Sequence, residues 1–300
     1  MPQSLAGQVI LITGASAGIG AALAKALAPS SNVRLVLAAR RVEKLEEVAI
    51  ACRSMGAEVL TVATDMAEPA QVEALAQAAL EKFGRVDAVV NNAGYGQMGP
   101  IELVPTEAAQ QQFAVNLIAP LTLVKMLIPP MRSQGGGRIV NISSLGGRLA
   151  FPLGGLYSSS KFALEGLSDA LRMELEPFNI KVSVVEPGPV GTEFFDVSKQ
   201  TVATAIANPT NTPYRAAFEQ LDQLRGRLGR QLWTSEQVAQ VIIKALSDRH
   251  PRPRYVAATG GNILLFLMTK VMPTWMVDDF WQRFYGIDRV AKDWQSNQAD

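Results

Sequence analysis

The stretch Gln8-Val-Ile-Leu-Ile-Thr-Gly14-Ala-Ser-Ala-Gly18-Ile-Gly20 joins a short apolar run to a cluster of glycines. An alanine- and leucine-rich helical pattern follows it to about Ala28. This order is typical of a buried strand, a glycine turn and a helix in a βαβ unit. Glycines let the backbone approach a pyrophosphate, and the helix start offers free N–H groups to the anion. The candidate pyrophosphate residues are Gly14, Ser16, Gly18, Ile19 and Gly20.

Similar apolar runs recur along the chain, with helical patterns between them. We expect further strands at residues 33–39, 59–63, 86–90, 138–142 and 180–185. Short runs that are apolar throughout are typical of strands buried on both faces, as in a parallel sheet. We see no internal repeat longer than this strand–helix alternation. The sequence therefore predicts an α/β fold with helices on both faces of a parallel sheet.

The composition excludes several classes of protein. Of the 300 residues, 48% are hydrophobic and 18% are charged, and the net charge of +1 provides no basic field for nucleic acid. The only cysteine, Cys52, rules out an internal disulfide and favours a reducing compartment. The only histidine, His250, lies beside a proline, which leaves little basis for a catalytic triad or a histidine metal site. With no signal peptide or membrane-spanning run in view, we expect a cytoplasmic protein.

The end of the second strand predicts the cofactor. NAD sites usually carry a carboxylate at this place, which binds the ribose 2′-hydroxyl. This chain instead has Ala39 followed by Arg40 and Arg41, and a guanidinium suits a 2′-phosphate. We therefore prefer NADP(H) to NAD, with Arg40 as the phosphate ligand. Arg41 fits a solvated charge at a helix start better.

Two further strand ends add cofactor candidates. Asp65 follows the third strand and either bonds the adenine amine or caps the next helix; the surrounding motif favours the adenine. The fourth strand ends in Asn91-Asn92-Ala93-Gly94, where small residues let the backbone lie against a flat cofactor. The candidates from these two places are Asp65, Met66, Asn92, Ala93 and Gly94.

The stretch from Asn141 to Lys161 carries the candidate chemistry. Tyr157 and Lys161 are four residues apart at the start of a helical pattern, so they share one helix face. A nearby ammonium is expected to lower the pKa of Tyr157 from about 10 toward the range of general acid and base catalysis. Ser143 and Ser144 end the preceding strand, where a hydroxyl can hold a substrate oxygen. Taken alone, these residues also fit an interfacial aromatic, a solvated lysine and turn serines.

With these motifs in order, the chain resembles the short-chain dehydrogenase/reductase family. The resemblance runs from about Gln8 to Phe195 and includes a last strand near Arg254 to Ala258. It implies a seven-stranded parallel Rossmann sheet with helices on both faces. It places Asn91 and Gly94 beside the adenosine. It also implies that Pro187, Gly188, Val190 and Thr192 hold the nicotinamide carboxamide, and that the catalytic residues are Asn116, Ser144, Tyr157 and Lys161.

Each catalytic residue has a role in that resemblance. Ser144 is preferred to Ser143 because the family serine lies thirteen residues before the tyrosine. Ser144 positions the carbonyl, Tyr157 exchanges the proton, and Lys161 lowers the tyrosine pKa and holds the nicotinamide ribose. Asn116 helps a water chain reach Lys161, or alternatively bonds a backbone carbonyl for structure alone. Several segments resemble the branch of hydroxysteroid and retinol dehydrogenases.

The region from about 194 to 233 is expected to be an insertion that covers the nicotinamide side. It contains a loop at 208–213 and a helix at 214–225, and a segment of this length often forms a lid. Apolar residues at its start and after the catalytic strand are expected to line the substrate pocket. These residues are Leu149, Phe151, Leu153, Phe194 and Phe195.

We divide the chain into one domain, residues 1–258, and a C-terminal extension, residues 259–300, packed on it. Two short helices divided by Pro273 give the extension apolar surface, which we expect to dock on protein; contact of residues 260–285 with a membrane is the alternative. The long helices at 106–131 and 157–176 are apolar on more than one side, which favours a homodimer or homotetramer.

These observations predict an NADPH-dependent carbonyl reductase, or the reverse alcohol dehydrogenase, for a hydrophobic ketone. A rival is a 3-ketoacyl thioester reductase, which needs a cationic patch for its carrier; Arg132 and Arg138 are the candidates. Another rival is a nucleotide-sensing or scaffold protein that binds NADP without catalysis. We expect no metal.

Overall fold

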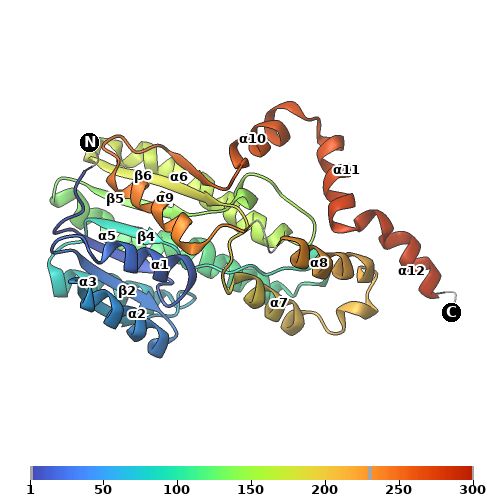
Figure 1. Cartoon of the computed structure of the whole chain (residues 1–300), viewed down its shortest axis with the longest axis horizontal. Coiled ribbons are helices and arrows are strands. Elements are labelled where there is room, and N and C mark those ends of the chain that lie inside the picture. The colour runs from blue at the N-terminus through green and yellow to red at the C-terminus, as the bar shows by residue number, and fades with distance from the viewer. Residues whose placement is uncertain (1–2, 229–231, 299–300) are drawn as a thin grey trace.

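The computed structural model describes residues 3–228 and 232–298. Within them, seven strands form a single parallel sheet in the order β3-β2-β1-β4-β5-β6-β7 (Figure 1). The strands are β1 (Val9–Thr13), β2 (Arg34–Ala39), β3 (Glu58–Ala63), β4 (Ala88–Asn91), β5 (Gly137–Ile142), β6 (Ile180–Pro187) and β7 (Arg254–Ala257). The predicted seven-stranded parallel sheet is therefore confirmed.

Helices cover both faces of this sheet, as the sequence predicts. One face is covered by α1 (Gly18–Leu27), α2 (Val42–Ser54) and α9 (Ser235–Ser247), and the other by α3 (Pro69–Phe83), α5 (Ala119–Ser133) and α6 (Gly155–Leu175). Each face has its own core, in which strand side chains are excluded from water. Ile10 and Ile12 enter the first core and Val9 and Leu11 the second, because successive side chains of a strand point to opposite faces.

The expected helix at 106–131 is interrupted. It consists of α4 (Thr106–Phe113), a π-helical turn η2 (Ala114–Ile118) and α5, and Asn116 lies within that turn. Such π turns occur frequently at functional sites. Thr106–Ser133 is long and apolar enough to cross a membrane by length and composition. Here, however, Leu123, Leu127 and Met131 are buried against the sheet, as in a core helix.

The insertion after β6 contains more helix than expected. The sequence predicts one helix there, at 214–225. The structure has a helix before the loop as well, α7 (Phe194–Ala205), followed by a 3-10 turn, η5 (Pro209–Asn211), and α8 (Arg215–Leu228). Val202, Ile206 and Phe218 form a small separate core that holds α7 against α8. This tertiary packing overrides the weak helix propensity of the valine- and threonine-containing segment.

The C-terminal extension leaves the sheet after β7 and runs beyond the body of the domain (Figure 1). It comprises α10 (Gly261–Phe266), a π turn η6 (Leu267–Val271), α11 (Thr274–Tyr285), a 3-10 turn η7 (Ile287–Arg289) and α12 (Val290–Gln298). The break at Pro273 matches the prediction, whereas α12 lies beyond the two helices expected. Leu265 and Met268 pack on Leu149, which fixes the start of the extension beside the sheet.

Three further 3-10 turns complete the described elements: η1 (Ile101–Leu103), η3 (Leu145–Gly147) and η4 (Glu176–Phe178). The direction of strand order reverses between β1 and β4, which are neighbours in the sheet. Ligands of open α/β sheets bind in the crevice at the carboxyl ends of the strands beside such a reversal. The fold therefore opens a site where β1, β4, β5 and β6 end.

Candidate active site

A cavity of about 1180 Å³ lies at this edge of the sheet. Most of the residues singled out from the sequence line it. They are Gly14, Ser16, Gly18, Ile19, Arg40, Asp65, Met66, Asn92, Ala93, Gly94, Ser144, Tyr157, Lys161, Pro187, Gly188, Val190 and Thr192. Gly20, Asn91 and Asn116 are not among its lining residues. No cluster of potential metal ligands occurs in the described part of the chain.

The glycine turn fits a pyrophosphate. A Cβ atom on Gly20 would lie 2.4 Å from the Gly14 carbonyl oxygen, so only glycine allows this turn to close. The Asn92 side chain donates to the carbonyls of Thr13 (2.9 Å) and Gly14 (3.2 Å), which holds the turn against the end of β4. Ala17, at the start of α1, makes no side-chain cap hydrogen bond. The first N–H groups of α1 are thus left for an anion.

Charged side chains lie at the far end of the cavity, beyond β2. The Arg40 guanidinium is exposed and lies 3.8 Å from the Asp65 carboxylate, so the two groups form a weak ion pair. Asp65 also accepts a hydrogen bond from the Ala67 amide (2.9 Å), in the turn before α3. The N-cap residue of α3 is Glu68, so Asp65 does not cap that helix, contrary to the capping alternative. Arg41 instead donates to Glu193 (2.6 Å), which also binds Lys44 (2.8 Å). Sequence reasoning missed this connection because Glu193 is distant along the chain.

Three side chains meet at the inner end of the cavity. Tyr157 and Lys161 project from the first turns of α6, and their exposed fractions are 7% and 5%. The Lys161 ammonium donates to the Ile142 carbonyl (2.9 Å) and lies 6.0 Å from the centre of the Tyr157 ring. The Ser144 hydroxyl accepts from the Gly146 amide (3.0 Å) at the end of β5, which fixes its position.

The pKa of Tyr157 differs from the sequence-based expectation. Burial raises it to about 12, and a hydrogen bond with Ser144 opposes this effect only in part. Burial also lowers the pKa of Lys161 to about 8, against the attraction of Glu165. The expected lowering of the Tyr157 pKa by Lys161 is therefore wrong for this structure, because desolvation of the phenolate dominates. The Tyr157 phenol is therefore protonated at neutral pH.

Asn116 lies behind the cavity. Its amide group donates to the Tyr95 carbonyl (3.0 Å) and to the Ser160 hydroxyl (3.0 Å), while its oxygen accepts from the Tyr95 amide (3.2 Å). The contacts with the Tyr95 backbone agree with the alternative prediction, in which Asn116 bonds a backbone carbonyl for structure alone. A Cβ atom on Gly94 would lie 3.1 Å from the Asn116 oxygen and 3.3 Å from the Lys161 nitrogen. Gly94 is therefore on the catalytic side and not near the adenosine end.

Asn91 is also placed differently from the expectation. Its side chain is buried and donates to Asn141 (2.8 Å), which donates in turn to Ser168 (2.8 Å). These contacts join β4, β5 and α6 inside the sheet layer. Asn91 therefore stabilises the interior rather than contacting a ligand beside the adenosine.

The segment after β6 closes the cavity from one side. Pro187 offers its carbonyl to the Ser144 hydroxyl at 3.5 Å, and Gly188 donates to the Ala257 carbonyl (3.2 Å). Thr192 lies over the glycine turn, since a Cβ atom on Gly18 would be 3.2 Å from its methyl group. The segment thus runs from the catalytic serine to the start of α1.

Apolar side chains form the outer part of the cavity. All five expected pocket residues line it: Leu149, Phe151, Leu153, Phe194 and Phe195. The Phe194 ring meets the Tyr157 ring edge to face, with 5.5 Å between centres. The opposite wall comes from the extension, where Tyr285 stacks on Phe151 (5.6 Å) beside Trp281. Sequence reasoning identified these extension aromatics as a docking surface but did not place them in the pocket.

The two arginines proposed for an acyl carrier lie elsewhere. Neither lines the cavity. Arg138 is buried and donates to the carbonyls of Ala245 (3.1 Å) and Asp248 (2.5 Å). Arg132 lies over the Phe178 ring at 4.2 Å. Arg132 and Arg138 therefore do not form the cationic patch that a 3-ketoacyl thioester reductase needs for its carrier.

Comparison with known proteins assigns the family. A profile of the short chain dehydrogenases matches residues 8–203, which include the glycine turn and the candidate residues Ser144, Tyr157 and Lys161. The chain belongs to the short-chain dehydrogenase family. As a short-chain dehydrogenase it is an oxidoreductase, and the match spans six of the seven strands, β1 to β6.

Relatives of this short-chain dehydrogenase differ in what they bind. Human 17-beta-hydroxysteroid dehydrogenase type 1 is 31% identical over 84% of this chain and 77% of the relative. A Burkholderia phymatum short-chain dehydrogenase/reductase, solved with NAD, is 29% identical with a TM-score of 0.78, over 88% and 94% of the two chains. A metagenomic short-chain oxidoreductase, solved with NADP, is 32% identical with a TM-score of 0.67, over 85% and 98%.

Proposed function

We propose that this short-chain dehydrogenase is an NADPH-dependent carbonyl reductase for hydrophobic ketones, with Tyr157 as the proton donor. One observation carries the proposal: Ser144, Tyr157 and Lys161 converge at the inner end of a cavity whose outer walls are apolar. A small number of polar groups in a largely apolar pocket is typical of sites for small hydrophobic ligands. The same groups serve alcohol oxidation in the reverse direction.

The chain's own residues account for binding and proton transfer. Gly14, Gly18 and the start of α1 would hold the cofactor pyrophosphate, and Lys161 would hold its nicotinamide ribose. When bound, the nicotinamide supplies the hydride. Ser144, fixed by the Gly146 amide, orients the substrate carbonyl. Tyr157 is protonated at neutral pH and gives its phenolic proton to the carbonyl oxygen as charge develops there.

The rate of reduction is expected to fall in alkaline solution. The pKa of Lys161 is lowered to about 8, so the lysine is charged below that pH and becomes neutral above it. Loss of the charge removes the cation that stabilises the developing tyrosinate. We expect kcat for ketone reduction to be level at pH 6–7 and to decline through about pH 8. A rate that stays level to pH 10 would show that Lys161 does not act through its charge.

We infer NADPH as the cofactor because Arg40 is available for a 2′-phosphate. It is exposed and weakly paired, whereas Arg41 and Lys44 are held by Glu193. Replacing Arg40 by alanine should lower kcat/KM for NADPH by about ten- to a hundredfold and change the NADH value little, since it removes a charge-assisted contact. Steady-state kinetics with both cofactors measure this. An equal effect on both would contradict the assignment.

We also propose that the protein is a cytoplasmic homodimer or homotetramer. Phe162 and Met173 of α6 are exposed, and they lie eleven residues apart, about three helical turns, on one side of the helix. Ile118, also exposed, lies in the neighbouring π turn. Light scattering should give a mass of two or four chains. The double variant Phe162→Glu, Met173→Glu should be monomeric, because it puts charges into the interface; an unchanged mass would refute this surface.

A further inference from the structure

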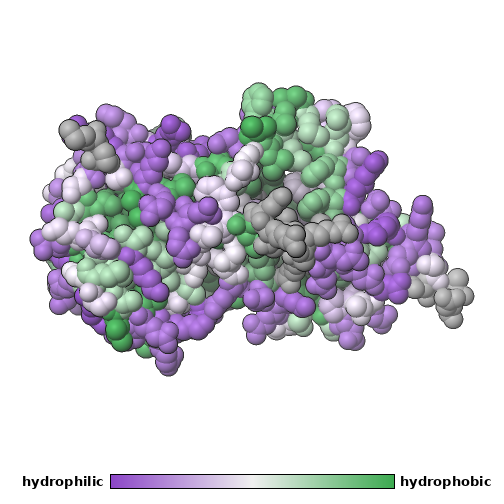
Figure 2. All heavy atoms as spheres, in the orientation of Figure 1, coloured by the Kyte–Doolittle hydropathy of each residue, from purple (hydrophilic) through white to green (hydrophobic). Residues whose placement is uncertain are grey.

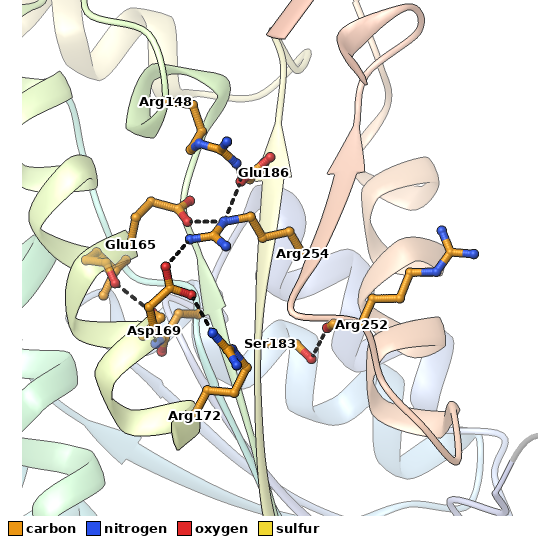
Figure 3. Close-up of polar contacts among 11 residues, drawn as sticks. Arg148, Glu165, Asp169, Arg172, Ser183, Glu186, Arg252 and Arg254 are labelled. Carbon is orange, nitrogen blue, oxygen red and sulfur yellow. Dashed lines mark hydrogen bonds and ion pairs between the residues drawn. The ribbon is translucent and has the colours of Figure 1, made fainter. Parts of the chain in front are cut away.

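A group of charged residues follows the candidate catalytic lysine on α6, and two of them, Glu165 and Glu186, are buried. Arg254 reaches from β7 across β6 to α6, where its Nε is 2.9 Å from Glu165 and its terminal nitrogen 2.6 Å from Asp169 (Figure 3). The same Nε is 3.3 Å from Glu186, at the end of β6. One arginine thus joins the catalytic helix to the strand that leads into the segment starting at Pro187.

Glu165 is the member of this group that lies beside the stem of Lys161. It follows Lys161 by four residues on α6 and therefore lies one turn further along the same helix face. A Cβ atom on Gly147 would contact both side chains, at 3.2 Å from Glu165 Cγ and 3.3 Å from Lys161 Cβ. The Ser143 hydroxyl is 2.5 Å from the same point. The side chains of Lys161, Glu165 and Ser143 thus lie close together around Gly147.

The charges around Glu165 come from every neighbouring element. Cations come from α6 (Lys161, Arg172), from the turn after η3 (Arg148) and from β7 (Arg254); carboxylates come from α6 (Asp169) and β6 (Glu186). Glu186 is fully buried, with Arg148 at 3.2 Å from its carboxylate. One oxygen each of Glu165 and Glu186, and the Ser143 hydroxyl, are buried without a hydrogen-bond partner in the described structure.

We propose that Glu165, held by Arg254, is a positioning residue that keeps Lys161 in its charged, catalytic state. The carboxylate compensates the burial of the ammonium, which otherwise favours the neutral amine. Burial and the charge of Glu165 both raise the pKa of Glu186 above its ordinary value. The Glu165 carboxylate, bound by Arg254, lies one helical turn from Lys161 on the same helix.

The test is the pH dependence of Glu165→Gln, and it rests on the proposed role of Lys161. We expect the alkaline decline of kcat to move to lower pH by about one unit. The pH at which NADPH affinity falls, followed by nicotinamide fluorescence, should move equally. Because that titration needs no turnover, it remains informative if the proposed substrate class is wrong. Glu165→Asp keeps the charge at a shorter reach and should give a smaller shift if Glu165→Gln does not fold.

Two matched variants separate the electrostatic role from a structural one. Asp169→Asn removes another carboxylate from Arg254, one turn further from Lys161, and should leave both pH profiles in place. Glu186→Gln removes the other carboxylate that Arg254 and Arg148 contact and should also leave them in place. A uniform loss of kcat in Glu165→Gln with an unmoved decline would overturn the proposal, as would an equal shift in Asp169→Asn.

A different observation carries a second inference, which concerns the outer face of the extension. Large apolar side chains gather there, and Figure 2 shows hydrophobic surface over α10 and α11. Trp275 is 69% exposed and Ile263 67%. The full set on this outer face is Ile263, Phe266, Leu267, Val271, Trp275, Met276 and Phe280. Leu265, Met268 and Trp281 point the other way and pack on the domain, so the inner side of the extension docks on protein.

We infer that this outer face docks on a lipid bilayer. Between residues 259 and 277 the only charged side chain is Lys270, which suits a phospholipid surface. The exposed carboxylates of Asp278 and Asp279 follow this stretch, so the part of the face that meets lipid is residues 259–277. The apolar segment Gly261–Val271 is too short to span a bilayer, so it lies in the interface. The inner side of α11 lines the catalytic cavity. An apolar ketone dissolved in lipid would thus reach Tyr157 without crossing water, which extends the proposed function.

Flotation with phosphatidylcholine vesicles tests this inference without any turnover. The full chain should rise with the vesicles, and the double variant Phe266→Ser, Trp275→Ser should stay at the bottom. Ile50→Ser, which removes an equally exposed apolar side chain from α2, should float like the parent. A parent chain that stays at the bottom would refute lipid docking. If the double variant instead has a smaller mass by light scattering, a second copy of the chain covers this face.

Discussion

Replacing Tyr157 by phenylalanine is expected to reduce kcat for ketone reduction by about a thousandfold. The change removes the phenolic proton and leaves the ring, whose packing against Phe194 does not need the hydroxyl. NADPH affinity, measured by fluorescence, should remain within a few fold of the parent value. Loss of turnover with intact cofactor binding is the result that separates an enzyme from a sensor or scaffold.

Tyr255→Phe is the matched control for this experiment. Tyr255 is also buried, with its pKa raised to about 12, but its hydroxyl bonds Asp248 (2.7 Å) and the Arg252 amide (2.9 Å) outside the cavity. The same chemical change should cost some stability there and leave kcat nearly unchanged. If both variants kept full activity, Tyr157 would not be the proton donor.

Replacing Gly20 by alanine is expected to weaken NADPH binding by about a hundredfold or more, roughly 3 kcal/mol. The added methyl group would lie 2.4 Å from the Gly14 carbonyl oxygen and 2.7 Å from the Asn92 amide nitrogen. Both atoms are fixed, since that amide nitrogen bonds the Thr13 and Gly14 carbonyls. The backbone of the turn must therefore move away from its anion-binding geometry. Isothermal titration with NADPH measures the loss.

Gly166→Ala provides the comparison. Gly166 lies inside α6, and a Cβ atom there meets nothing within 4 Å. Gly166 is not among the residues that line the cavity, and a helix interior accepts alanine readily, so this variant should bind NADPH normally. Equal affinity in the two variants would contradict a tight glycine turn at the cofactor.

Much of the fold follows from local sequence pattern. The runs at β1 and β2 are almost entirely apolar because both faces of each strand are covered, and that property is visible in the sequence. The spacing of Gly14, Gly18 and Gly20 marks a turn that excludes side chains. The four-residue spacing of Tyr157 and Lys161 places them on one helix face. These features need no knowledge of distant contacts.

Features that depend on burial or on distant partners were not predictable in this way. The direction of the Tyr157 pKa shift is set by how completely the cavity walls enclose the phenol. The first helix of the insertion exists because Val202 packs on Phe218. Arg254 meets Glu165 across 89 positions of sequence, so no local pattern indicates the pair. Asn91 resembles a ligand residue in sequence and is instead part of the interior.

The most direct test of the proposed function is the loss of reduced-nicotinamide absorbance with NADPH and with NADH, over ketones from small to steroid-sized and 3-ketoacyl thioesters. We expect turnover of the large apolar ketones, faster with NADPH than with NADH, since the cavity walls are apolar and Arg40 is exposed and only weakly paired. Turnover of acyl thioesters alone would contradict the substrate class. A preference for NADH would contradict the cofactor, and NADPH binding without turnover in either direction would contradict catalysis.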